Sequence, residues 1–405
     1  MSDVSWQIKS LSELGRFSRG KSKHRPRNDK KLFTNGTYPL IQTGDIKNAN
    51  LYVTKNSDYY NEFGLSQSKL WEQGTLCITI AANIAETAIL SYPMCFPDSV
   101  VGFNAHKNES SELFVYYVFE LIKKEIQKTS SGSIQDNINI DYLTKLKFKV
   151  PNKDYQDSIV NLLSTIDKKI LINNQINEEL EAMAKTLYDY WFVQFDFPDE
   201  NGKPYKSSGG KMVYNDQLKR EIPEGWGVKQ LGEVSICHDS RRVPLSSKDR
   251  ENKNGIIPYY GATGIMDYID DFIFEGDYIL MAEDGSVMTS EGKPILQRIT
   301  GKTWVNNHAH VLEPTNEYSC KLLLLSLKDI SVLQIKTGSI QMKITQENMN
   351  KILLPDIGRD LLSKINEVLL PIDEKQLKLL KQNQELTQLR DWLLPMLMNG
   401  QVRVE

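Results

Sequence analysis

The chain has 405 residues, and its 49 lysines and arginines nearly balance 52 aspartates and glutamates, for a formal net charge of -3. This length accommodates about two to four domains. The hydrophobic fraction of 40% is typical of a folded protein and excludes wholesale disorder. The balanced charge excludes a uniformly basic, histone-like binder of nucleic acid, but not a binder whose cations cluster locally.

The start of the chain and its cysteines bear on where the protein works. Residues 1–10 lack the apolar segment of a secretory signal. The apolar runs fall far short of the roughly 20 residues that span a bilayer. No two cysteines form a CxxC pair, which argues against a disulfide framework or a zinc ribbon; they are Cys77, Cys95, Cys237 and Cys320. We therefore expect a cytoplasmic protein without membrane contact.

Four short motifs occur twice along the chain, in the same order each time. They are Trp6, Leu11 and Glu13 against Trp226, Leu231 and Glu233; 38–40 against 257–259; 132–135 (GSIQ) against 338–341 (GSIQ); and 166–169 (IDKK) against 372–375 (IDEK). One such match could arise by chance, but four in register indicate two divergent copies of one unit.

Each copy begins with a module of short apolar runs separated by turn residues, which predicts strands. Residues 75–80 in the first module and 277–281 in the second are examples, and each follows a glycine. The apolar stretch 113–126 predicts a helix inside the first module. Residues 322–335 are its expected counterpart in the second.

Each copy continues with a helical stretch, near 156–193 and 365–397, whose apolar residues are spaced alternately by three and four. They are Ile159, Leu163, Ile166, Ile170, Leu180, Ala184, Leu187 and Trp191, and then Ile365, Leu369, Ile372, Leu379, Leu386, Leu393 and Leu397. The two stripes pack either on each other, as in a coiled coil, or on their own modules. Asn177 and Asn383 occupy matched positions, where they either fix the register or face solvent. Pro371 is expected to kink or break the second helix.

Between the copies lies a connector, residues 195–210, dense in proline, glycine, serine and asparagine. A search for catalytic motifs finds none that convinces. Gly301-Lys302-Thr303 is only the tail of a phosphate loop, and Asp284 with Glu291 and Lys293 forms a triplet that is common by chance. The sequence therefore predicts a binding protein and not an enzyme.

His308 and His310 share one face if they lie on a strand, and they could form half of a metal site. No third ligand can be named. Packing with a hydrogen bond is the preferred interpretation of both histidines.

The strongest local excess of positive charge lies in the segment 16–31, which has eight lysines and arginines and one acid, Asp29. Its glycine and proline predict a loop, and a mobile basic loop suits contact with DNA phosphates. The alternative is a solvated loop. The candidate phosphate contacts are Arg19, Lys21, Lys23, Arg25 and Arg27, with Arg241 and Arg242 as a poorer counterpart in the second copy.

Other loops carry side chains that can bond to the edges of bases, since glutamine suits adenine and lysine suits guanine. The candidates are Gln42, Thr43, Ser133 and Gln135 in the first copy, and Tyr260, Thr263, Ser339, Gln341 and Lys343 in the second. The repeated Gly-Ser-Ile-Gln could instead mark a turn that the fold requires.

Taken together, the repeated Trp-x4-Leu-x-Glu, Gly-Ser-x-Gln and Ile-Asp-x-Lys motifs resemble the specificity (S) subunits of type I restriction–modification systems, which serve bacterial defence and DNA methylation. The connector 195–226 and the string 304–311 (WVNNHAHV) are similar to that family as well. The first module departs from it, because 100–104 stand where the second has its Asn-Asn-His-Ala-His string. The DNA contacts of the family can therefore be assigned only poorly to individual residues of this chain.

The resemblance implies an α+β fold, with two mixed α/β target-recognition domains separated by two long helices that form an antiparallel coiled coil of pseudo-two-fold symmetry. The expected regions are domain 1 (1–150), a central conserved helical region (151–196), a connector (197–222), domain 2 (223–355) and a C-terminal conserved helical region (356–405).

The resemblance also implies the partners: double-stranded DNA with a bipartite target, two methyltransferase subunits and two restriction subunits. S-adenosylmethionine, ATP and Mg²⁺ would belong to those subunits, and this chain would hold no catalytic residue, cofactor or metal. The alternative function is a tandem coiled-coil adaptor that binds only protein.

Overall fold

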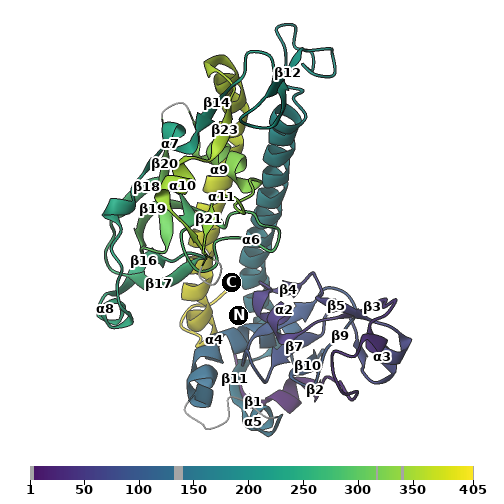
Figure 1. The fold of residues 1–405 in the computed structure, drawn as a ribbon. Coiled ribbons are helices and arrows are strands. Elements are labelled where there is room, and N and C mark those ends of the chain that lie inside the picture. Colours follow the sequence, from purple (N-terminus) through teal and green to yellow (C-terminus); the bar gives the residue numbers. More distant parts are fainter. Residues whose placement is uncertain (1–3, 132–139, 316–317, 339–341, 405) are drawn as a thin grey trace. The chain divides into compact units, whose positions relative to one another are not determined.

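The computed structural model describes residues 4–131, 140–315, 318–338 and 342–404. The chain forms two compact units, as the coloured ribbon in Figure 1 allows the reader to follow. Unit 1 comprises Met1–Asn174 with Leu380–Glu405, and unit 2 comprises Gln175–Leu379. Each unit therefore contains one module of the repeat together with a part of each long helix.

Unit 1 contains a five-stranded sheet of order β2-β10-β7-β8-β4, a four-stranded sheet of order β5-β3-β9-β6, and the antiparallel pair β1–β11. The elements in chain order are β1 (Trp6–Ser10), α1 (Leu11–Leu14), β2 (Gly15–Arg19), the 3-10 turn η1 (Lys30–Leu32), β3 (Tyr38–Leu40), α2 (Thr43–Asn48), β4 (Tyr52–Val53), β5 (Asp58–Tyr60), α3 (Glu62–Ser66), β6 (Leu70–Trp71), β7 (Leu76–Thr79), β8 (Thr87–Leu90), β9 (Met94–Cys95), β10 (Val100–Ala105), α4 (Glu112–Ser131), α5 (Ile140–Lys145) and β11 (Lys147–Pro151).

The middle strands of the five-stranded sheet are buried on both faces. Alternate residues of β7 belong to different cores, because side chains along a strand point to opposite faces. Leu76 and Ile78 pack in the core that contains Phe114 of α4, whereas Cys77 packs in the core that contains Trp71. The strand predicted at 75–80 and the helix predicted at 113–126 are both confirmed.

Unit 2 is built on a six-stranded sheet of order β15-β20-β18-β19-β16-β17, with the antiparallel pairs β12–β13, β14–β23 and β21–β22 beside it. The elements in chain order are β12 (Met212–Asn215), β13 (Arg220–Pro223), β14 (Gly227–Gln230), α7 (Leu231–Val234), β15 (Ser235–Cys237), the 3-10 turn η3 (Asp239–Arg241), α8 (Ser247–Glu251), β16 (Asn254–Tyr260), β17 (Ile265–Ile269), β18 (Phe274–Ala282), β19 (Leu296–Val305), β20 (Ala309–Pro314), α9 (Cys320–Lys328), β21 (Lys336–Thr337), β22 (Lys343–Ile344), α10 (Gln346–Asn350) and β23 (Leu353–Asp356).

Of the strand and the helix predicted for unit 2, the strand is confirmed and the helix is shorter than predicted. The strand predicted at 277–281 is confirmed as part of β18. The helix predicted over 322–335 ends early, at Lys328. Beyond that point the backbone N–H of Val332 donates to the carbonyl of Gly292, at 3.0 Å, and so leaves the helical pattern.

The first repeated motif has a structural role in both units. Leu11 of α1 and Leu231 of α7 are completely buried. The carboxylates of Glu13 and Glu233 accept hydrogen bonds from the backbone N–H groups three residues earlier, at 2.7 and 2.6 Å. These bonds satisfy donors at the start of a short helix. The leucine and the glutamate of this motif therefore serve the fold: the leucine fills the core, and the glutamate caps the short helix.

The long helices are α6 (Lys153–Tyr188), which continues into a π-helical turn (η2, Asp189–Val193), and α11 (Arg359–Met398). In unit 1 the beginning of α6 packs with the end of α11, since Leu163 and Leu397 share one core. In unit 2 the end of α6 packs with the beginning of α11, since Ala184 and Ile365 share another. The helices are thus antiparallel within each unit, and they also pack on the adjacent modules.

Amide side chains join the two helices on the unit 1 side. The fully buried Asn173 donates to the side-chain oxygens of Gln382 and Asn383, at 2.9 and 2.8 Å. Asn383 in turn donates to Asn174, at 2.7 Å. Asn383 therefore lies on the seam between the helices instead of facing solvent, as a polar residue that fixes register would.

The repeated Ile-Asp pair attaches each long helix to the rest of its unit. In unit 1 Asp167 accepts hydrogen bonds from the Tyr117 hydroxyl, at 2.6 Å, and from Arg390, at 2.9 Å. In unit 2 Asp373 accepts a bond from Arg298, at 2.8 Å. Both aspartates are buried, so these ion pairs are shielded from water.

The sequence predicts that Pro371 kinks or breaks the second helix; the break is wrong, because α11 runs without interruption through it, and the kink stays a prediction. The neighbours Leu369 and Ile372 are buried in the core of unit 2. Their packing compensates for the hydrogen bond that proline cannot donate. The two-module α/β fold with two long helices is confirmed, whereas the pseudo-two-fold symmetry stays a prediction. Among the described residues, no helix is both long and apolar enough to cross a bilayer.

Candidate nucleic-acid interface

The basic segment of unit 1, residues 16–31, begins inside β2 and ends inside η1, so the predicted loop is confined to residues 20–29. Its backbone is held in place, because Gln67 Oε1 accepts from the backbone N–H of Lys23, at 2.7 Å, and of His24, at 3.1 Å. The Ser68 hydroxyl donates to the carbonyl of Lys21, at 2.9 Å. A fixed backbone with exposed cationic side chains suits phosphate contact, since little order has to be imposed on binding.

The five candidate cations of this segment are exposed, but they are not equally free. Arg27 pairs with Asp98 at 2.7 Å, and Arg25 lies 3.9 Å from the same carboxylate. Within the described part of the chain, Arg19, Lys21 and Lys23 form no ion pair. These three therefore carry uncompensated charge that an anionic partner could neutralise.

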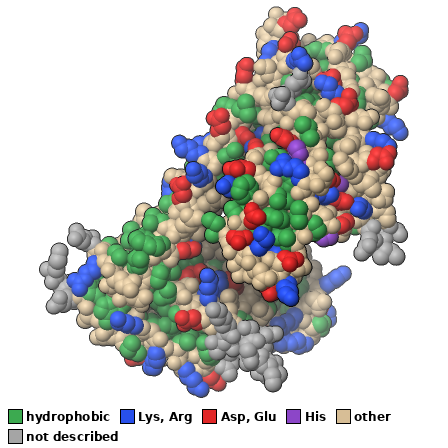
Figure 2. All heavy atoms as spheres, turned by 90° about the vertical axis from the view of Figure 1, so that its left-hand side faces the viewer, with side chains coloured by type: hydrophobic (Ala, Val, Ile, Leu, Met, Phe, Trp, Pro, Cys, Tyr) green, Lys and Arg blue, Asp and Glu red, His purple; other side chains and the backbone are tan. Residues whose placement is uncertain are grey.

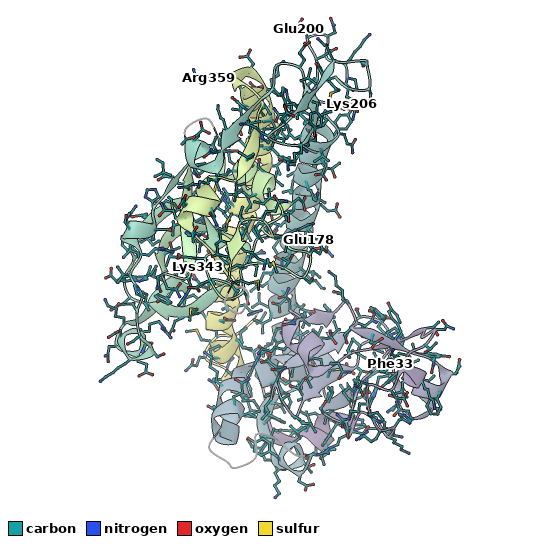
Figure 3. The ribbon with its side chains drawn as sticks, viewed as in Figure 1. Phe33, Glu178, Glu200, Lys206, Lys343 and Arg359 are labelled. Atoms are coloured by element: carbon teal, nitrogen blue, oxygen red, sulfur yellow. The ribbon has the colours of Figure 1, made fainter. Side chains whose placement is uncertain are left out.

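A cavity of about 660 Å³ opens beside this segment in unit 1. Its lining brings together the basic loop, η1, the start of α2 and the residues just before and at the start of β5; these are Arg27, Asn28, Lys30, Phe33, Thr34, Gln42, Ser57 and Asp58. Phe33 is labelled in Figure 3. Two predicted site residues, Arg27 and Gln42, therefore meet in one cavity. Thr43 follows Gln42 and is half-buried.

Sequence reasoning missed several members of this cavity. Lys30 stands in the basic segment, so charge counting could have selected it. Ser57 and Asp58 carry no such signal, because only the pairing of β3 with β5 brings them close to Gln42. The predicted residues Ser133, Gln135, Ser339 and Gln341 lie outside the described residues, so the GSIQ loops stay a prediction.

In unit 2 the predicted arginines are engaged by the protein itself. Arg242 donates to Glu283, at 2.6 Å, and to the carbonyl of Ala309, at 2.7 Å. Its side chain is only 11% exposed. Arg241 donates to the carbonyl of Ile273, at 2.8 Å, and lies over the ring of Phe274. The role of these two arginines as phosphate contacts stays a prediction. To bind DNA, each guanidinium group would have to give up its present partners within the protein.

The other candidates of unit 2 lie on two hairpins. Tyr260 ends β16 and is half-buried, and this burial raises the pKa of its hydroxyl. Thr263 is exposed in the turn between β16 and β17. Lys343, labelled in Figure 3, begins β22 and is 49% exposed. Its hydrogen bond to Glu283, at 2.9 Å, raises the pKa of its ammonium group, so Lys343 stays charged. Acidic and basic side chains are intermixed on the face of unit 2 seen in Figure 2.

The two histidines of the string 304–311 do not form a common site. His308 is exposed and lies 2.7 Å from Asp284. His310 is buried, and its ring nitrogens lie near Asp239 Oδ2, at 2.5 Å, and the carbonyl of Ile344, at 2.8 Å. The Cys237 thiol lies close to this pair. The preferred interpretation of packing with a hydrogen bond agrees with the position of His310.

The motifs rejected as catalytic have structural roles. Gly301, Lys302 and Thr303 lie inside strand β19 and so lack the loop conformation that binds phosphate. Lys293 pairs with Glu291, at 3.1 Å, and with Asp329, at 2.8 Å. Asp284 is directed instead to His308.

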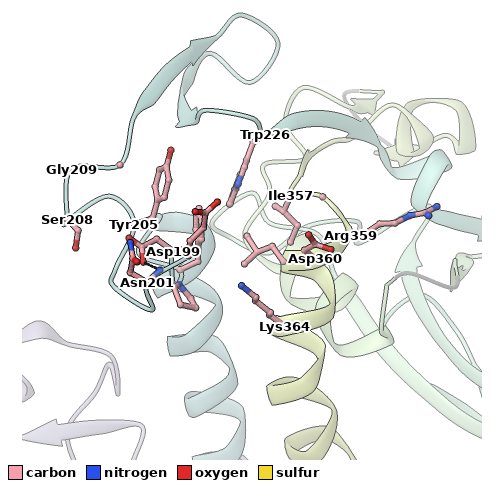
Figure 4. A pocket seen from close by; sticks show the side chains of 16 residues that line it. Asp199, Asn201, Tyr205, Ser208, Gly209, Trp226, Ile357, Arg359, Asp360 and Lys364 are labelled. Carbon is pink, nitrogen blue, oxygen red and sulfur yellow. Dashed lines mark hydrogen bonds between the residues drawn. The ribbon is translucent and has the colours of Figure 1, made fainter.

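The connector forms a second cavity, of about 800 Å³, in unit 2 (Figure 4). Phe197 stacks between Tyr205 and Trp226, with ring centroids 4.8 and 5.3 Å apart. The opposite wall is the start of α11 with Arg359, Asp360 and Lys364. The connector is therefore an ordered element that begins at the end of η2 and includes the β12–β13 hairpin.

Comparisons with known proteins agree with this architecture. The family model of the type I restriction modification DNA specificity domain matches residues 3–182 and 223–386. The chain is 26% identical to the type I restriction enzyme MjaIX specificity subunit of Methanocaldococcus jannaschii, over 99% of this chain and 94% of that one. It is 24% identical to the HindI specificity subunit of Haemophilus influenzae, over 73% and 75%. A crystal structure of the S subunit from M. genitalium has a similar fold, with a TM-score of 0.53 at 18% identity, over 98% of this chain and 97% of that one.

Proposed function

The chain belongs to the type I restriction modification DNA specificity family, and from this membership we propose how its two units recognise DNA. It provides the DNA-sequence specificity of a type I restriction–modification complex. This role replaces the alternative of an adaptor that binds only protein. We propose that the target is bipartite and that each unit binds one half of it.

The observation that carries this proposal is the basic segment of unit 1, whose uncompensated cations lie on the same segment as Arg27 in the wall of the cavity. Lys21 and Lys23 would contact phosphates, because their charges are exposed and unpaired within the described residues. Gln42 stands in the cavity with a side-chain amide that can bond to a base edge. Arg27 and Arg25 would contribute less, since Asp98 already offsets part of their charge.

In unit 2 we propose that Lys343, Tyr260 and Thr263 contact DNA, because they lie on two hairpins, β16–β17 at one edge of the main sheet and β21–β22 outside it. Four predicted contacts that lie outside the described residues remain proposed: Ser339 and Gln341 in the second copy, with Ser133 and Gln135 in the first. Arg241 and Arg242 would act mainly by stabilising the fold of unit 2, since their guanidinium groups already have partners within it.

The helices supply the proposed spacing and the proposed docking surface for the other subunits. An α-helix of 36 residues, such as α6, is roughly 54 Å long, compared with about 34 Å for one turn of DNA. In unit 2 three apolar side chains on α6 and its continuation η2 recur every seven residues and are exposed: Ile176, Met183 and Tyr190. In unit 1 Leu389 and Trp392 of α11 are exposed as well. Exposed apolar stripes of this kind suit helix–helix docking.

We propose that two methyltransferase subunits bind these helices and that two restriction subunits join in the restriction complex. S-adenosylmethionine, ATP and Mg²⁺ would bind those subunits, with this chain contributing no catalytic residue. The complex would work in the cytoplasm, where the host DNA lies.

Binding of the assembled complex to duplex DNA tests the proposal. Specific duplex should bind more tightly than random duplex, and scrambling either half of the target should abolish part of that preference. A complex that binds all duplexes equally at every salt concentration would contradict it.

A further inference from the structure

A second segment of unit 1, residues 61–69, lies along the basic segment, and we call it the α3 segment. It consists of Asn61, the helix α3 and the residues that lead into β6 (Figure 1). The Asn61 side chain donates to the carbonyl of Lys31, at 2.9 Å. The Ser68 hydroxyl donates to the carbonyl of Lys21, at 2.9 Å. The α3 segment is therefore joined to the basic segment at two separate places.

Lys69, the last residue of the α3 segment, is an exposed cation in a fixed position. Its ammonium nitrogen lies 3.4 Å from the centroid of the Trp71 ring. Trp71 is only 4% exposed and stacks on Phe96, with ring centroids 4.8 Å apart. The ring attracts the ammonium group but does not neutralise its charge. The core of unit 1 thus positions Lys69, while its charge stays available to a ligand.

The charge of Lys69 adds to that of the basic segment. Within the described part of the chain, Lys69 forms no ion pair, as is also true of Lys21. Partial burial, and then the charge of Lys21, lower the pKa of the Lys69 ammonium, so the two cations repel each other. The one carboxylate of the α3 segment, Glu62, accepts instead from the Tyr38 hydroxyl, at 2.5 Å. Two like charges without a counter-ion favour an anionic ligand, because it relieves their repulsion.

An aromatic side chain on the same segment is also exposed. Phe63 of α3 is 48% exposed, which by itself is ordinary on a protein surface. Its ring, however, contacts that of His24 edge to face, with centroids 5.4 Å apart, and so lies beside the loop that carries Lys23 and Arg25. Phenylalanine is one of the apolar residues that contact bases in the grooves of DNA.

We propose that the α3 segment is a second part of the DNA-binding surface of unit 1, in which Lys69 contacts a phosphate and Phe63 makes an apolar contact with a base. This inference rests on the proposed function, in which the basic segment contacts DNA. The two contacts differ in kind. A phosphate contact releases a counterion and weakens with salt, whereas an apolar contact does not depend on counterions.

The test uses the full chain assembled with its methyltransferase subunits, and a duplex carrying the motif that is methylated in cells expressing the chain. Lys69→Met removes the charge and keeps an apolar side chain over Trp71. The slope of log affinity against log salt should fall by about 1, since one counterion fewer is released. Lys69→Arg retains the charge and should keep the slope. Lys69→Gln also removes the charge and gives the same test if Lys69→Met does not fold.

Phe63→Ala should weaken binding about five- to tenfold, the scale of burying part of an aromatic side chain, without changing the salt slope. The penalty for scrambling one half of the target should fall by the same factor, and the penalty for the other half should stay constant. Phe63→Leu keeps an apolar side chain and should lose less affinity. A loss spread evenly over both halves would overturn the base contact.

Two exposed residues of unit 1 away from the α3 segment serve as matched controls. Ala105, at the end of β10, pairs with Gly15 at the start of β2, so Lys107 lies at the opposite end of this strand pair from the basic loop. Ile8 is an exposed apolar residue of β1. Neither Lys107→Met nor Ile8→Ala should change the affinity or the slope.

The double change Lys21→Ala and Lys23→Ala separates failure of this inference from failure of the proposed function. If the double change lowers the slope and Lys69→Met does not, the basic segment contacts DNA and the assignment of the α3 segment is wrong. If neither lowers the slope, the proposed DNA-binding surface of unit 1 is itself wrong. A decrease for Lys107→Met as large as that for Lys69→Met would also overturn the inference.

Discussion

The two units use their arginines and lysines differently at the same place in a shared fold. At the end of β2 and in the anchored loop after it, unit 1 has the cations Arg19, Lys21 and Lys23, which are exposed and, among the described residues, unpaired. After β15, unit 2 has Arg242 inside an ion network and Arg241 over an aromatic ring. The difference teaches that a cation becomes available to DNA only when its neighbours leave its charge uncompensated.

The same contrast holds for the long helices. Asp167 and Asp373 occupy matched positions, yet Asp167 is bonded by a tyrosine and by an arginine of the other helix. Asp373 is bonded by Arg298, which belongs to the sheet and also pairs with Asp277. The repeat retains the buried carboxylate, while its partners come from different elements.

Replacing Arg298 by methionine should produce the largest effect. The change leaves Asp373 buried without its partner, which costs about 3–5 kcal/mol of the free energy of unfolding. Hydrogen exchange of the full chain should show faster exchange in α11 near Asp373. Arg390→Met is the matched change in unit 1. It should cost less, because Asp167 keeps the Tyr117 hydroxyl and Arg390 is more exposed. If both changes cost the same free energy of unfolding, the number of partners left to each aspartate would not matter.

Replacing Gln42 by alanine should relax one half of the target by roughly 1–3 kcal/mol, the scale of a bidentate base contact. Binding to targets substituted at each position would locate the loss. Gln334→Ala, at an exposed glutamine of unit 2, serves as the control and should leave binding unchanged. A loss spread evenly over both halves would instead indicate a defect in folding.

The double change Lys21→Ala and Lys23→Ala should weaken binding to every sequence. The slope of log affinity against log salt should fall by about 2, since each lysine releases roughly one counterion. The pair Arg25→Ala and Arg27→Ala should lower the slope by less, because Asp98 compensates part of their charge. An identical decrease for both pairs would remove the distinction between free and paired cations.

The smallest expected effect concerns acid, which should act in opposite directions on Asp239 and Glu283 of unit 2 and on Glu120 of unit 1. Burial by itself would raise the pKa of Asp239 and of Glu283. The hydrogen bond from His310 nevertheless lowers the pKa of Asp239, and those from Arg242 and Lys343 lower the pKa of Glu283. Their stabilisation is present above the ordinary values of 3.8 and 4.5 and is lost as pH falls through the lowered values. Burial raises the pKa of Glu120 in unit 1, so its contribution improves as pH falls from the raised value towards 4.5.

Hydrogen exchange of the two units at several acidic pH values would measure this difference. Asp239→Asn with Glu283→Gln should flatten the response of unit 2, and Glu120→Gln should flatten that of unit 1. Parallel responses in the unaltered chain would contradict the assignment.

The sequence predicted the repeat, the long helices and two of the main strands, at 75–80 and 277–281, because periodicity and repeated motifs are local signals. It also predicted the basic segment, since charge can be counted. It could not predict that Asp98 would reach Arg27, or that Asp239 and Glu283 would enclose Arg242, because those contacts depend on strands far apart in the chain. The end of α9 at Lys328 and the continuity of α11 through Pro371 likewise depend on tertiary packing.

The proposed function requires each unit to read its own half of a divided target. The most direct test is to express the chain with its methyltransferase subunits in cells free of adenine methylation and to sequence the genome with detection of methylated bases. We expect one motif made of two specified blocks separated by a spacer of fixed length and free sequence. A single continuous block, or two blocks at variable separation, would contradict it.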